Sequence, residues 1–143
     1  MSIYMTGVGV GSFKVTYNAV DLTDHIRSVT INQTFDDIDV TAMGAVAHAH
    51  VPGLRDDSVD IEFYQDFAAS EVDATINGLL GSTSGATLLI QTSGTTVTAT
   101  APKYTVLAAP FNYSPIDGQV GTASMTKVTF KPVAGQYIAR GTS

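Results

Sequence analysis

The segment at residues 34–66 constrains the fold of this chain more than any other, because it places a long unpatterned stretch between two strand-like runs. The first run is FDDIDVT, the second is DSVDIEFYQD, and the weakly polar sequence AMGAVAHAHVPGLRD lies between them. Loops longer than about 12 residues without regular structure are uncommon in compact domains and are usually functional. This loop carries four apolar side chains that a solvated loop has no reason to keep: Met43, Val46, Val51 and Leu54. We therefore expect an irregular loop that another subunit covers.

Period-two alternation predicts a mainly β, antiparallel fold. After the loop, Val59, Ile61 and Phe63 share one face of a strand and polar residues occupy the other, which is typical of a half-buried antiparallel strand. Ile38 and Val40 indicate another strand before the loop. Further strands are predicted at residues 13–17, 20–22, 29–34, 87–92, 95–100, 104–113 and 120–133, with tight turns at residues 18–19 and 93–94. The expected architecture is an antiparallel β-sandwich or flattened barrel.

One short helix is predicted beside the sheet. Ser70 is a candidate N-cap with Asp73 three residues later, close to a capping box, and Gly81 is placed to end the helix. The apolar stripe that would pack on the sheet consists of Val72, Ile76, Leu79 and Leu80.

The composition indicates a single domain with an unusually small share of water-facing charge. Charged residues make up 14% of the 143 residues, against about 25% in an average globular domain. The net charge of −6 argues against attraction to nucleic-acid phosphates. No apolar run approaches the roughly 18 residues of a membrane-spanning helix, so we expect no membrane anchor. We expect one domain over residues 1–143, with a flexible Gly-rich N-terminal arm at 1–12 and a polar C-terminal arm at 135–143.

Two polar groupings were weighed as metal sites. His48 and His50 would share a strand face, but two imidazoles are an incomplete zinc site and His25 is too distant in sequence to count as a third ligand. The aspartates at 36, 37, 39, 56 and 57 are rich in oxygen ligands but lack the spacing of an EF-hand loop. We interpret the histidines as interface or surface residues and the aspartates as a solvated acidic face.

Catalytic motifs are also missing from the sequence. No serine lies in a nucleophile-elbow context, no histidine is flanked by an orienting acid in a recognisable catalytic motif, and no carboxylate pair stands out. With no cysteine, a thiolate site or disulfide framework is not available. We therefore expect no enzymatic activity, no cofactor and no bound metal.

Several motifs in this region carry a resemblance to a known family. These are VDLTDHI at residues 20–26, VTAMG at 40–44, VPGLRD at 51–56 and FYQD at 63–66. Together with the short helix they resemble the major tail tube proteins of long-tailed, siphovirus-like bacteriophages, and the matching pattern covers about residues 13–92.

The resemblance implies a virion structural protein whose copies form hexameric rings that stack into a tail tube, the conduit for DNA ejection into the host bacterium. Its partners would be further copies of itself and the tape measure, terminator and tail tip proteins, and it would assemble in the host cytoplasm. DNA would pass through the lumen without specific binding. The loop between the two strands would stack on the next ring, through Met43, Val46, His48, His50, Val51, Pro52, Leu54 and Arg55. An acidic wall of the channel would be formed by Asp37, Asp39, Asp60 and Glu62.

Two other functions fit the same sequence. One is a ring-forming tube or terminator component of another phage tail or a secretion machine. The other is a monomeric β-sandwich module that binds carbohydrate, which would not form rings. The low charge content and the apolar loop favour the assembling classes.

Overall fold

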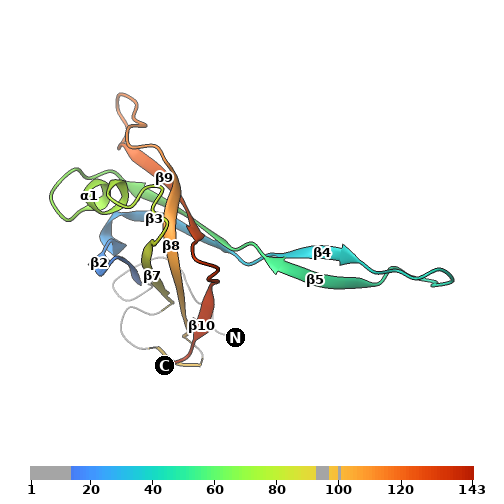
Figure 1. Cartoon of the computed structure of the whole chain (residues 1–143). Helices are drawn as coiled ribbons and strands as arrows, with labels where there is room; N and C mark the ends of the chain where they lie inside the picture. Colours follow the sequence, from blue (N-terminus) through green and yellow to red (C-terminus); the bar gives the residue numbers. More distant parts are fainter. Residues whose placement is uncertain (1–13, 93–96, 100) are drawn as a thin grey trace, which may run out of the picture.

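Antiparallel strands dominate the computed structural model, which describes residues 14–92, 97–99 and 101–143 (Figure 1). The strands are β1 Lys14–Tyr17, β2 Val20–Asp21, β3 Ile26–Asn32, β4 Phe35–Asp39, β5 His50–Arg55, β6 Ser58–Tyr64, β7 Ala86–Gln91, β8 Lys103–Tyr113, β9 Met125–Pro132 and β10 Ala139–Gly141. A 3-10 turn, η1 Thr23–His25, precedes β3, and the α-helix α1 Val72–Asn77 follows β6. None of the helices in the described ranges is long and apolar enough to cross a membrane. The predicted mainly β fold with one short helix is confirmed, and its sheet does not close into a barrel.

One large sheet forms the body of the protein, with the strand order β2-β1-β7-β8-β9-β6-β3. β10 pairs with residues 103–105 of β8, and β9 pairs with residues 108–113 along the same edge of that strand. β1 and β2 are joined by the predicted tight turn, in which Asn18 and Ala19 both have positive φ. The remaining strands, β4 and β5, form a separate two-stranded sheet.

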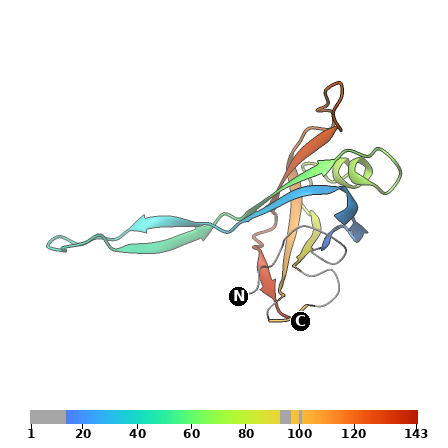
Figure 2. The same ribbon diagram turned by 180° about the vertical axis from the view of Figure 1, so that it is seen from behind.

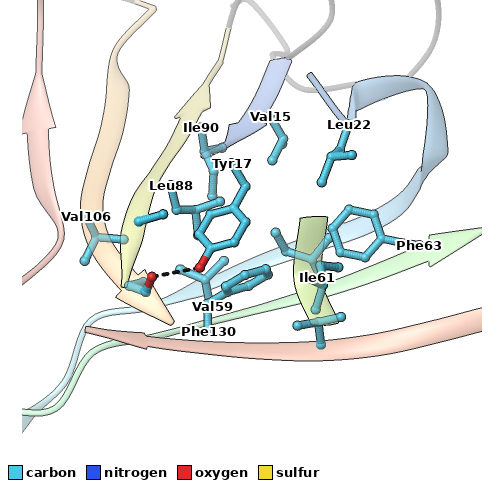
Figure 3. Close-up of a cluster of buried hydrophobic side chains, with 14 of the residues drawn as sticks. Val15, Tyr17, Leu22, Val59, Ile61, Phe63, Leu88, Ile90, Val106 and Phe130 are labelled. Carbon is cyan, nitrogen blue, oxygen red and sulfur yellow. Dashed lines mark hydrogen bonds between the residues drawn. The ribbon is translucent and has the colours of Figure 1, made fainter. Parts of the chain in front are cut away.

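The large sheet curls over its buried face. β7 and β8 separate β1 from β9, so a flat sheet with strands about 4.8 Å apart would hold those two strands about 14 Å apart. The rings of Tyr17 on β1 and Phe130 on β9 are nevertheless only 4.8 Å apart, in an edge-on arrangement (Figure 3). The Tyr17 hydroxyl donates a 2.9 Å hydrogen bond to the Ala108 carbonyl of β8. Alternate residues of β1, β6, β7 and β9 and two residues of α1 fill the enclosed core.

The long segment between β4 and β6 differs from the prediction, because it is largely a hairpin and not an irregular loop. β4 and β5 pair with Ile38 opposite Val51 and Asp39 opposite His50. Figures 1 and 2 show this hairpin extending far from the body, on the side away from α1. The sequence pattern concealed β5 because both faces of an isolated hairpin meet solvent, so burial does not impose alternation.

The helix is shorter than predicted and lacks the predicted cap. α1 covers Val72–Asn77, its N-cap is Glu71, and no side chain caps it. Ser70 has a φ of 63°, outside the extended region that an N-cap occupies. Of the predicted packing face, Val72 and Ile76 are fully buried and Leu79 packs against the core, but Leu80 is exposed because the chain already turns there.

The start of β9 and the C-terminal segment also differ from expectation. β9 begins at Met125 and not at residue 120, after a loop in which Gly121 has a φ of 86°. The predicted C-terminal arm docks in part, since Ile138 is buried and β10 pairs with β8. The N-terminal arm at residues 1–12 and the predicted turn at 93–94 lie outside the described residues, as do residues 95, 96 and 100 of the strand predicted after that turn.

Candidate functional site

The projecting hairpin is the strongest candidate for a functional site, because it contributes little to the core and exposes both of its faces. We call residues 34–56 the arm. Its backbone ladder runs from the bond between Asp56 N–H and the Thr34 carbonyl (2.8 Å) to the bond between Val40 N–H and the Ala49 carbonyl (2.9 Å). At the tip, Ala45 N–H bonds to the Ala42 carbonyl and Gly44 adopts a φ of 89°. The arm is therefore ordered by backbone hydrogen bonds and not by side-chain packing.

One face of the arm and its tip are apolar and lack cover. Ile38 and Val51 lie opposite each other in the ladder, and both are close to half exposed. Met43 and Val46 at the tip are completely exposed, and Leu54 is 80% exposed. A two-stranded hairpin is marginally stable by itself in water, so an arm with this much exposed apolar surface indicates a contact with another molecule.

The opposite face of the arm carries two histidine–aspartate pairs. His50 Nδ1 lies 2.7 Å from Asp37 Oδ1, and His48 Nδ1 lies 3.3 Å from Asp39 Oδ2. The hydroxyl and N–H of Thr41 both donate to Asp39, and these bonds, with His48 adding to them, hold the pKa of Asp39 below its ordinary value. The arm is thus two-faced, with paired polar groups on one side and unpartnered apolar groups on the other.

A buried ionic joint fixes the arm to the body. Asp57 is almost fully buried, and its carboxylate lies 2.8 Å from the Arg55 guanidinium. The same carboxylate accepts hydrogen bonds from the N–H of Ile138 (2.9 Å) and of Thr34 (3.3 Å). The Arg55 guanidinium also stacks over the ring of Tyr137, 4.7 Å from its centroid. The base of the arm and the C-terminal segment are therefore held as one unit.

This joint corrects the sequence interpretation of Asp57 and shows where Arg55 lies. Asp57 was placed on a solvated acidic face, yet it is buried because Arg55 and two backbone N–H groups satisfy its charge. Arg55, which the resemblance places in the loop that stacks on the next ring, lies at the base of the arm, where it also stacks on Phe35. The Arg-Asp-Asp run at 55–57 in a weakly charged segment was the available sequence signal.

The predicted stacking residues are otherwise gathered on the arm, but on different surfaces. Met43 and Val46 form the tip, His48 and His50 belong to the polar face, and Val51 to the apolar face. Pro52 lies opposite Asp37 in the ladder, and Leu54 is exposed near the base.

The four predicted channel residues fall into two separate groups. Asp37 and Asp39 lie on β4 in the arm, whereas Asp60 and Glu62 lie on the outward face of β6 in the large sheet. Asp60 accepts a 2.8 Å hydrogen bond from Thr129, and Glu62 lies 3.7 Å from Arg27 and opposite Lys127. The charge of Glu62 is therefore partly balanced by neighbouring cations, whereas Asp60 is bonded to neutral side chains.

A polar cluster that the sequence analysis did not find lies beside α1. His25 Nε2 is 3.0 Å from Asp66 Oδ2 and 3.6 Å from Glu71 Oε2, and its Nδ1 is 2.8 Å from Asp24 Oδ1. Burial by itself lowers the pKa of His25, but the carboxylates of Asp66, Asp24 and Glu71 outweigh it and raise the pKa above its ordinary value. The N–H of Ala68 and the His25 ring lower the pKa of Asp66. Asp66 and Glu71 lie 41 and 46 positions after His25 in the chain, so no local sequence pattern indicates that the three side chains meet.

Comparison with solved structures shows which fold the chain has. It matches a chain of the sheath–tube complex of an extracellular contractile injection system in the extended state (TM-score 0.65, 12% identity, covering 95% of this chain and 92% of that one). It also matches a chain of the virion of a native gene transfer agent (TM-score 0.64, 10% identity, 90% and 95% covered) and one of the tube-terminating cap of an anti-feeding prophage (TM-score 0.66, 12% identity, 100% and 95% covered). No protein-family model and no curated protein sequence matches the chain. The chain thus has a phage tail tube-like fold, and these likenesses do not single out long-tailed phages.

Proposed function

We propose that this protein is a non-enzymatic structural subunit of a phage-type tail tube, in which hexameric rings of the chain stack into a hollow tube. The observation that carries the proposal is the arm, an ordered hairpin whose apolar face and tip have no partner among the described residues. The tail tube-like fold of the body supports the same conclusion.

Stacking is the role that the arm supports. An arm that reaches out from one copy and docks on a different surface of the next copy makes a heterologous contact. Such a contact does not close on itself when the copies are displaced along an axis, so it extends a filament. The buried joint of Asp57 with Arg55 and Ile138 supports this role, because it holds the arm at a set angle to the body.

Within one ring, the large sheets of neighbouring copies join edge to edge. β3 ends the strand order of the described sheet, so its outer edge offers unpaired backbone groups. Pairing that edge with a neighbour removes the aggregation hazard that a free strand edge creates. The outward face of β6, with Asp60 and Glu62, then lines the lumen beside β3.

The setting of the tube and its cargo are those that the sequence resemblance implies. The tube belongs to the virion of a long-tailed phage, assembles in the host cytoplasm with tape measure, terminator and tail tip proteins, and conducts DNA during ejection. The net charge of −6 supports passage of DNA without retention, because like charges repel.

A terminator or cap ring is the second candidate. Similar structures include chains of a sheath–tube terminator complex and of a tube-terminating cap, at TM-scores of 0.65 and 0.66. Such a ring would share the fold and would form rings, but would not extend into a long tube.

The experiment is assembly of the purified chain, observed by negative-stain electron microscopy and light scattering. The test variant is Met43→Ser with Val46→Ser, which removes the apolar tip without touching the core, and Val120→Ser is the control, since all three side chains are fully exposed. Tubes for the parent and the control, with unstacked rings or monomers for the tip variant, support the tube function. If the parent forms rings that never stack, the terminator function is favoured. If the tip variant forms tubes as readily as the parent, the arm does not mediate stacking.

A further inference from the structure

The cluster around His25 brings together three metal-ligating side chains from separate segments. His25 is the last residue of η1, Asp66 follows β6, and Glu71 precedes α1. One ligand atom from each lies within 4.8 Å of the other two. The side chain of His25 is only 16% exposed, and the side chains of Asp66 and Glu71 are each about one-third exposed. The cluster lies beside α1, away from the arm, so the stacking proposal makes no use of it (Figure 1).

Two of the three distances between the ligand atoms are close to those of a tetrahedral site. Zinc bonds of about 2.0–2.1 Å to nitrogen and oxygen, at tetrahedral angles, place neighbouring ligand atoms roughly 3.3 Å apart. Nε2 of His25 lies 3.0 Å from the Asp66 oxygen and 3.6 Å from the Glu71 oxygen, on either side of that value. Small side-chain movements would therefore centre one ion between the three atoms and leave a fourth position for water.

The other ring nitrogen of His25 lies next to a carboxylate. Metal-bound histidines usually present their second ring nitrogen to a carboxylate or carbonyl, which fixes the ring and its tautomer. Here Nδ1 lies 2.8 Å from the Asp24 carboxylate, although without the alignment of a hydrogen bond, and Nε2 is directed at Asp66 and Glu71. Asp66 is itself positioned, since its second oxygen accepts the Ala68 N–H at 2.9 Å.

Charge also favours a divalent cation. Three carboxylates surround one imidazole, so even a protonated His25 leaves the group at about −2 by formal charge. An ion of charge +2 bound to a neutral imidazole would balance the carboxylates more completely than a proton does, and an imidazole with two carboxylates is a donor set that zinc accepts.

We propose that His25, Asp66 and Glu71 bind one zinc ion, with the Asp24 carboxylate as a neighbouring negative charge. The ion would tie the loop between β6 and α1 to η1 and so hold the helix against the body. This inference does not depend on the tube function, because it concerns the folding of a single chain.

The experiment measures zinc binding to the full-length protein after metal removal by a chelator, by isothermal titration calorimetry and thermal unfolding. It is run in a His48→Gln, His50→Gln background, because the chain has three histidines and this leaves His25 alone. One zinc per chain, a rise in Tm with zinc concentration and a zinc-induced change in the nitrogen NMR signal of Nε2 are expected. Ligand binding to the folded state alone stabilises it by RT ln(1 + [L]/Kd), so the rise should continue beyond saturation.

Variants separate the metal site from an ion-paired histidine. Glu71→Gln and His25→Gln should each weaken zinc binding by at least about tenfold, since each removes one ligand from a partly preformed site. Asp73→Asn is the control, an acid near the cluster that lies outside the ligand set. A flat zinc titration, an equal response to magnesium, or equal binding by the His25→Gln variant and the control would overturn the proposal and leave His25 as an ion-paired histidine. Tube formation has no part in these readouts, so they test the zinc site whether or not the tube proposal holds.

Discussion

The Asp57 carboxylate accepts the backbone N–H of Ile138 at 2.9 Å, although 81 residues separate them in the chain. The bond fastens the C-terminal segment to the base of the arm, where Asp57 also pairs with Arg55 at 2.8 Å. This joint connects the part of the molecule that reaches outward to the part that holds the core.

Removal of this carboxylate should destabilise the protein strongly. Asp57→Ala would leave the Ile138 N–H and the Arg55 guanidinium without their partner in a buried place, and we expect a loss of about 3 kcal/mol of unfolding free energy. Urea unfolding measures it. Asp56→Ala is the control, because Asp56 is the exposed neighbour. Equal losses for the two variants would show that the joint contributes nothing specific.

Two glycines that both have a positive φ should lose different amounts of stability when they are replaced by alanine. Gly81 has a φ of 72° and open space around a new Cβ, so Gly81→Ala should cost only the backbone strain of about 1–2 kcal/mol. Gly85 has a φ of 62°, and its Cβ would lie 2.7 Å from the Ala108 carbonyl oxygen. Gly85→Ala should therefore lose clearly more stability than Gly81→Ala, as measured by thermal unfolding. The reverse order would mean that β7 and β8 separate easily at this point.

The hydroxyl of Tyr17 should make a modest contribution inside the core. Tyr17→Phe keeps the edge-on contact with Phe130 but removes the hydrogen bond to the Ala108 carbonyl, so we expect a loss of about 1 kcal/mol. Phe130→Ala, which opens a cavity in the same place, should cost about 3–5 kcal/mol. Denaturant unfolding of both variants gives the comparison, and a Tyr17→Phe loss as large as that of Phe130→Ala would contradict it.

Alkaline pH should weaken the fold through two tyrosines. Burial raises the pKa of Tyr17 to about 12, and burial with the hydrogen bond to Asp73 raises the pKa of Tyr113 to about 12, from an ordinary value of 10.0. Because the folded pKa is the higher one, the unfolded chain releases these protons first. Their stabilisation is complete below about pH 10 and is lost as pH rises through about 12. Urea unfolding across this range should show a shallower decline for Tyr113→Phe, and an unchanged slope would count against the shift at Tyr113.

The two acidic groups should differ in their effect on DNA and on assembly. In assembled tubes, Asp60→Lys with Glu62→Lys reverses two charges per chain on the sheet, so we expect salt-dependent retention of duplex DNA in a filter-binding assay. Asp37→Lys with Asp39→Lys removes the partners of His50 and His48 on the arm and should instead reduce tube formation. If only the Asp37→Lys, Asp39→Lys variant retains DNA, the arm and not the outward face of β6 lines the lumen.

Local pattern in the sequence was sufficient for the elements that lie on the core. Val59, Ile61 and Phe63 alternate because β6 has one buried face, and all three are buried as predicted. The turn at Asn18 was also visible, because it depends on the residues of the turn and their immediate neighbours, whereas the helix ends at Asn77 and not at the predicted Gly81. The mainly β fold with one short helix therefore followed from the sequence alone.

The arm and the polar clusters depended on the tertiary structure. β5 gave no periodic signal because neither face of the arm is buried by this chain, and its strand state rests on the backbone ladder with β4. Asp57 is buried only because the distant Ile138 supplies an N–H, and His25 meets Asp66 and Glu71 only because β3 pairs with β6. The pattern of apolar residues thus predicts which side chains are buried. Which charges meet and which apolar groups stay exposed depends on contacts between residues far apart in the chain, and no local pattern records those contacts.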